Sequence, residues 1–146
     1  MKTTFINFKT LAILLLVTVG LAGCGDEEDE TKTPSEMLVG RWKLVKIGNN
    51  TVPSGTYLTL EINGSFTYEH YDPRKESMVV EEDIYEVLED WAYDELKKQF
   101  STVIRLGSSS GPFYCTLKEK EMILLPKRYY GEAFFADPTQ FFIKVK

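Results

Sequence analysis

The chain has 146 residues, with 17 Lys and Arg against 22 Asp and Glu, and its formal net charge is −5. This acidic balance, without a basic patch, excludes nucleic-acid binding as a function class. The single histidine excludes a metal site built from several histidines. Aromatic residues make up 13% of the chain, which favours strands over helices.

The N-terminal segment has the features of a secretory signal in the expected order. Lys2 and Lys9 make it positive, and an apolar run begins at Leu11 and ends near Gly20. This run is shorter than the roughly 20 apolar residues that a membrane-spanning helix needs. Small residues follow it directly before Cys24. We therefore expect residues 1–23 to be a cleaved signal peptide.

An acidic stretch follows Cys24. Residues 25–36 hold six acids and one lysine, and no apolar side chain that could be buried. We expect residues 24–36 to form a disordered, self-repelling tether. Residues 37–146 then suit a single domain, which is large enough to bury a core without a disulfide or a metal.

Two alternating segments open this domain. Residues 38–47 place Leu38, Gly40, Trp42 and Leu44 on one face of a strand. Residues 57–68 predict a hairpin whose three-residue loop has Gly64 in the left-handed position. This loop sets Leu60 opposite Phe66 and Leu58 opposite Tyr68, so that apolar side chains share a face.

The next segment breaks the strand pattern. An amphipathic helix is predicted near residues 83–99, between short strands at 77–81 and 101–106. Its apolar residues recur at helical spacing and are Ile84, Val87, Leu88, Trp91, Leu96 and Phe100.

The C-terminal part again predicts strands. Residues 113–125 read as a hairpin about Glu119 and Lys120, and residues 140–145 alternate with Phe141 and Ile143 facing inward. About eight short strands separated by turn signals predict an all-β domain, an antiparallel barrel that is closed or nearly closed.

Two motifs resemble known families. Leu21-Ala22-Gly23-Cys24 resembles the lipobox of bacterial lipoproteins, which implies that Cys24 is lipidated and anchors the protein to a membrane. Gly25, rather than Asp, follows the cysteine, so the enterobacterial signal for inner-membrane retention is absent and the outer membrane is the expected address. The alternative is ordinary signal cleavage, with Cys24 kept as a free thiol.

Gly40-Arg41-Trp42 is similar to the G-x-W motif of lipocalins, most closely to the short lipocalin-like domains of bacterial lipoproteins. The resemblance implies a lipocalin-like barrel in which Gly40 lets the first strand bend and Trp42 plugs the closed end. The helix expected near residues 83–99 departs from this family, where the helix normally comes late.

No catalytic constellation emerges, so the chain is not expected to be an enzyme or to need a cofactor. Glu69 and His70 are adjacent in a strand and point to opposite faces. Cys115 lies among apolar residues and is expected to be a small core residue.

Two functional hypotheses follow. In the first, the barrel interior binds a small apolar ligand, and the candidate residues are Leu58, Leu60, Phe66, Tyr68, Leu117 and Leu124. In the second, the core is filled and the domain is a surface interaction module, such as an accessory subunit or an inhibitor. Its candidate patch for a protein partner is Tyr129, Tyr130, Phe134 and Phe135.

Overall fold

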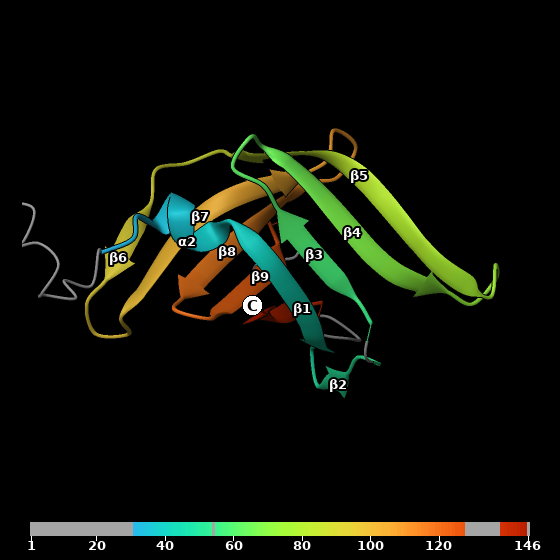
Figure 1. Cartoon of the computed structure of the whole chain (residues 1–146). Helices are drawn as coiled ribbons and strands as arrows, with labels where there is room; N and C mark the ends of the chain where they lie inside the picture. The colour runs from blue at the N-terminus through green and yellow to red at the C-terminus, as the bar shows by residue number, and fades with distance from the viewer. Residues whose placement is uncertain (1–30, 54, 128–137, 146) are drawn as a thin grey trace, which may run out of the picture. The chain divides into compact units, whose positions relative to one another are not determined.

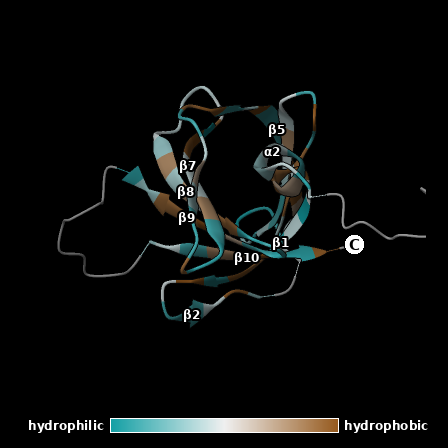
Figure 2. Cartoon of the chain, turned by 90° about the vertical axis from the view of Figure 1, so that its left-hand side faces the viewer, coloured by the Kyte–Doolittle hydropathy of each residue, from teal (hydrophilic) through white to brown (hydrophobic). Residues whose placement is uncertain are grey.

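Antiparallel strands form a closed barrel in the computed structural model, which describes residues 31–53, 55–127 and 138–145 (Figure 1). Each barrel strand pairs with the next one along the chain, and the last pairs with the first, so no strand of the ring lacks neighbours. Figure 2 shows the strands running around a common interior. The predicted fold class, an all-β lipocalin-like antiparallel barrel of about eight strands, is confirmed.

Within the described ranges, eight strands make up the ring. They are β1 (Gly40–Ile47), β3 (Tyr57–Leu60), β4 (Ser65–Asp72), β5 (Ser77–Val87), β7 (Gln99–Leu106), β8 (Pro112–Lys118), β9 (Glu121–Pro126) and β10 (Gln140–Val145). Two short strands, β2 (Asn50–Thr51) and β6 (Ala92–Asp94), pair with β1 and β7 respectively. The helix of this part of the chain is α2 (Pro34–Leu38).

The barrel has two different ends. At the closed end β1 begins, the β3–β4 hairpin turns, and α2 leads into the barrel with Leu38 buried in the core. At the open end β1 and β7 finish, and β8 and β10 begin.

Helix α2 begins inside the segment predicted to be a tether. Thr33 caps it through a capping box: the Thr33 Oγ1 accepts from the Glu36 N–H at 3.3 Å, and Glu36 Oε2 accepts from the Thr33 N–H at 2.7 Å. Pro34 stands in the first turn, where its missing N–H leaves no bond unmade. The hydrogen bonds from Thr33 hold the pKa of Glu36 below its ordinary value. Residues 34–36 are therefore helical.

Both predicted hairpins have the predicted register. Leu60 lies opposite Phe66 and Leu58 opposite Tyr68. Gly64 has φ +86°, the left-handed conformation that the three-residue loop demands. The second hairpin sets Leu117 opposite Met122 and Cys115 opposite Leu124, as expected.

The amphipathic helix predicted near residues 83–99 is wrong. The first residues of that range belong to β5, and Ala92–Asp94 form β6, which pairs with β7. Asp94 makes the turn between β6 and β7, because its Oδ1 accepts from the N–H groups of Leu96 and Lys97 at 3.0 and 3.1 Å.

Strand pairing overrides the helical spacing because the barrel closes through this segment. Tyr85–Val87 pair with Ile104–Leu106, and the Leu88 N–H donates to the Val103 carbonyl at 2.7 Å. The apolar residues that defined the helical face are consequently divided. Trp91 and Phe100 pack against the core, whereas the exposed ones are Ile84, Val87, Leu88 and Leu96.

The inward face of the last strand also differs from the prediction. Phe142, not Phe141 or Ile143, is buried in the barrel, and Ile143 is 42% exposed. Phe142 lies opposite Met122 on β9 and Leu44 on β1, both of which are buried. A shift of one residue turns every side chain of a strand to the other face.

Candidate functional site

The two motif residues of β1 lie at the closed end. Trp42 is fully buried, and its indole Nε1–H donates to the Leu38 carbonyl at 2.8 Å. The Lys144 ammonium lies 5.0 Å from the Trp42 ring and donates to the Met37 carbonyl at 2.7 Å. Lys144 thus ties β10 to α2 across the indole, and partial burial lowers the pKa of this lysine.

Gly40 makes this close packing feasible. Its φ of +136° is one that side chains with a Cβ rarely adopt. A Cβ at this position would lie 2.7 Å from Lys144 Cε. Glycine at position 40 therefore permits both the positive φ at the start of β1 and the approach of Lys144.

Side chains fill the half of the barrel above the closed end. Leu60, Leu117 and Leu124, three of the predicted ligand-binding residues, are completely buried there with Ile104 and Met122. These three leucines belong to the packed core and do not line the cavity described next.

Cys115 lies in the same packed region. Burial raises the pKa of its thiol to about 12, because the thiolate would lose its hydration. The side chain is therefore a neutral core residue, without the thiolate that a nucleophile requires.

The open half of the barrel holds a cavity of about 290 Å³. Leu58, Phe66 and Tyr68, the other three predicted residues, line it from β3 and β4. Residues that the sequence did not identify complete the lining: Leu106, Phe113 and Phe142 on the apolar side, and Glu81, Ser110 and Gln140 as polar groups.

Polar groups gather where β4 and β5 border this cavity. Tyr68 lies opposite Glu81 and stacks on His70, with ring centroids 5.0 Å apart. His70 Nε2 lies 3.5 Å from Glu81 Oε1. Burial, and secondarily the charge of Glu81, raises the pKa of Tyr68, so its hydroxyl stays protonated. The arrangement offers a ligand hydrogen-bond acceptors and a negative carboxylate.

Glu69 and His70 do not converge, as the strand alternation predicts. Glu69 points to the outer face, where its Oε2 accepts from Arg41 Nη2 at 3.1 Å. His70 instead faces Glu81, which lies diagonally opposite on the adjacent strand β5. The sequence predicts a short strand at residues 77–81 but not its register against β4, so Glu81 could not be identified as a neighbour of His70.

Some predicted sites lie outside the described residues. They are Cys24, the predicted lipidation site, and the aromatic patch of Tyr129, Tyr130, Phe134 and Phe135. Both stay predictions.

In the part of the chain that the structure covers, no three His, Cys, Asp or Glu side chains are placed to hold a metal ion. No helix in those same residues has the length and apolarity to cross a membrane. Neither a protein-family model nor a curated protein matches the sequence. The geometry of the open end is therefore the main guide to function.

Proposed function

We propose that this protein is a lipid-anchored envelope protein whose barrel binds a small, mainly apolar ligand at its open end. The observation that carries the proposal is the cavity of about 290 Å³ above a filled core. Ligand sites in proteins usually measure about 300–1,000 Å³, so the ligand is small.

The lining indicates which ligands suit the cavity. Six apolar or aromatic side chains form most of it, and they favour an apolar body. Glu81 is the only charged lining residue among those described, and its carboxylate disfavours an anionic head group. An uncharged or cationic amphiphile therefore fits better than a fatty acid.

Binding of an uncharged fluorescent amine, N-phenyl-1-naphthylamine, tests this proposal. The wild type should bind it saturably, with increased fluorescence. Leu106→Trp, which adds an indole to the cavity wall, should weaken binding at least tenfold. Leu96→Trp is the matched control, because Leu96 is 97% exposed on the β6–β7 turn and should leave binding unchanged. Absence of saturable binding, or equal binding by Leu106→Trp, would refute the ligand site.

The anchoring part of the proposal rests on the sequence around Cys24. A positive segment, an apolar run, small residues and a cysteine occur in the order that lipoproteins use. A lipoprotein cysteine carries a diacylglycerol and usually an N-acyl group, and two or more chains anchor stably. Cys24→Ala should release the protein from membranes and abolish labelling by radioactive palmitate. A wild-type protein that is unlabelled and soluble would contradict the anchor.

A further inference from the structure

Strand β5 has an open edge. It pairs with β4 along Ser77–Ile84 on one side, but with β7 only along Tyr85–Val87 on the other. Among the residues described, no strand lies on that second side of Ser77–Asp83. Figure 1 shows the far part of the β4–β5 hairpin projecting past the neighbouring strands. An exposed edge of this kind is a template for an added strand.

Main-chain hydrogen bonds define which residues face the open edge. The Tyr85 N–H donates to Gly64 on the β4 side at 2.7 Å, whereas the Ile84 carbonyl accepts from Gly107 on the β7 side at 2.8 Å. Successive residues of a strand direct their main-chain groups to alternate sides. The residues with N–H and C=O groups toward the open edge are consequently Met78, Val80 and Glu82.

The side chains along this edge divide into two kinds. Met78, Val80 and Ile84 are more than half exposed on the outer face. Glu81 and Asp83 lie on the opposite face of the strand, since alternate side chains point to opposite faces. Glu82 lies on the outer face between Val80 and Ile84. A partner strand would therefore meet mainly apolar side chains on its outer face and the carboxylates of Glu81 and Asp83 on its inner face.

The charge of β5 decides whether a second copy of this chain or a basic partner protein suits the open edge. Strand β5 contains four acids and no base, and the nearest bases in sequence, Arg74 and Lys75, precede it. Within the described chain, Glu82 and Asp83 form no salt bridge. A second copy pairing through β5 would bring like charges together, which destabilises a strand pair. A basic partner would complement them.

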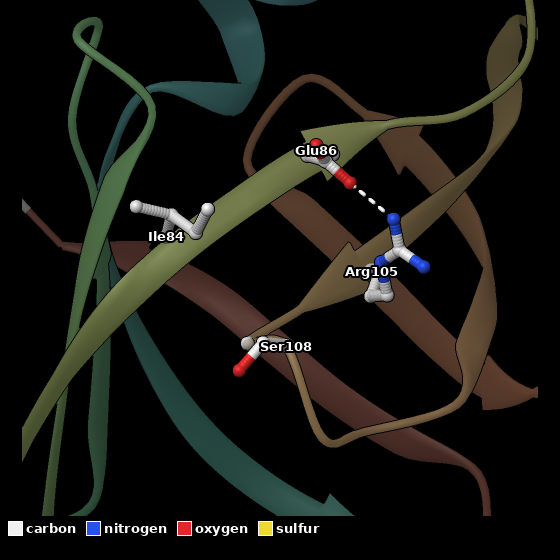
Figure 3. Close-up of a pocket in the computed structure, with 5 residues that line it drawn as sticks. Ile84, Glu86, Arg105 and Ser108 are labelled. Carbon is white, nitrogen blue, oxygen red and sulfur yellow. Dashed lines mark hydrogen bonds and ion pairs between the residues drawn. The ribbon is translucent and has the colours of Figure 1, made fainter.

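A small cavity marks where the open edge begins. It measures about 220 Å³ and is lined by Ile84, Glu86, Arg105, Gly107 and Ser108, at the point where the chain leaves β7 (Figure 3). Arg105 pairs with Glu86 on one side of it, as the dashed line shows. One side chain of an added strand could enter this space.

We propose that the open edge of β5 binds an extended segment of a partner protein in which apolar and basic residues alternate. The segment adds a strand to the sheet through main-chain hydrogen bonds, a recognised mode of peptide binding. Its apolar residues contact Met78, Val80 and Ile84, and its basic residues lie near Glu81 and Asp83.

A fluorescein-labelled nine-residue peptide of alternating valine and lysine tests this surface by fluorescence anisotropy. It should bind saturably, and binding should weaken several-fold as salt is raised. A valine–glutamate peptide, and a valine–lysine peptide N-methylated at alternate residues, should each bind at least tenfold more weakly. Equal binding of either control peptide would overturn the proposal.

A substitution in β5 removes one donor of the edge. Val80→Pro deletes an N–H that faces the open side and leaves the bonds to β4 in place, because proline is tolerated on an edge. Val80→Pro should weaken binding of the valine–lysine peptide at least fivefold. Val80→Thr, which keeps the N–H, should change this binding less than twofold. N-phenyl-1-naphthylamine binding by Val80→Pro verifies that the barrel is intact. A loss of peptide binding is thereby distinguished from a loss of the ligand site.

Hydrogen exchange locates the binding. The peptide should slow exchange of the Met78, Val80 and Glu82 amides and leave those of Val79 and Glu81 unchanged. Protection elsewhere would place the peptide on another surface and overturn the proposal. Dimerisation of the wild type that Val80→Pro abolishes would do the same, since it would assign the edge to a second copy.

Discussion

Cys115 reports how thoroughly the closed half of the barrel excludes water. Its thiol is fully buried, and this burial raises its pKa from 9.0 to about 12. No opposite charge or hydrogen bond offsets the loss of hydration, since desolvation is the only cause of the shift.

This shift predicts a loss of stability in alkali. Between pH 9 and 12 the unfolded chain releases the thiol proton while the folded chain keeps it. The stabilising contribution is fully present below pH 9, and it then falls by up to about 1.4 kcal/mol per pH unit. Urea titrations between pH 8 and 11 should show a steeper fall in the free energy of unfolding for the wild type than for Cys115→Ala. Parallel slopes would mean that the thiol is not buried.

At the scale of elements, the segment from β5 to β7 shows that apolar spacing need not indicate a buried face. Leu96→Ser should change the free energy of unfolding by less than about 0.5 kcal/mol, because Leu96 is 97% exposed. Leu117→Ala should cost about 2–5 kcal/mol, since Leu117 is fully buried. Urea denaturation measures both. A large loss for Leu96→Ser would support a buried helical face instead.

The sequence predicted the hairpins correctly, because the register of a hairpin depends on residues that are close together in the chain. The hairpin containing Gly64 was predictable because only one loop length puts Leu58, Leu60, Phe66 and Tyr68 on a shared face. Pairing between distant strands was not predictable. Tyr85 becomes part of a strand through Leu106, twenty-one positions along the chain. In β10 the alternation favours Phe141 and Ile143 as inward residues, because Phe142 shares its face with the polar Gln140 and Lys144. The partners Leu44 and Met122, on two other strands, select Phe142 instead.

The candidate site was predictable only in part. Leu58, Phe66 and Tyr68 were identified as interior residues and do line the cavity. The sequence could not tell them from Leu60 and Leu117, because position along the barrel axis separates the lining from the core. That position follows from the closure of all eight strands, which no single segment encodes.

At the scale of the whole molecule, closure links the first and last strands. β1 pairs with β10 from Arg41 to Ile47, so neither strand is a free edge. The described domain should unfold in one cooperative transition. Tryptophan fluorescence, which reports on Trp42 and Trp91, and far-ultraviolet circular dichroism should give the same urea midpoint. Two separated midpoints would show that part of the barrel unfolds independently.

The division of the barrel along its axis has a consequence for how the protein can change. Closed-half residues such as Trp42, Leu117 and Met122 carry most of the packing, whereas the mouth residues Phe66, Tyr68 and Phe113 are only partly buried. Substitutions at the mouth should therefore lower the free energy of unfolding less than substitutions in the closed half. They can still alter the shape and polarity of the cavity. The cavity of this barrel could therefore be reshaped by substitutions at its mouth while the packed closed half stays unchanged.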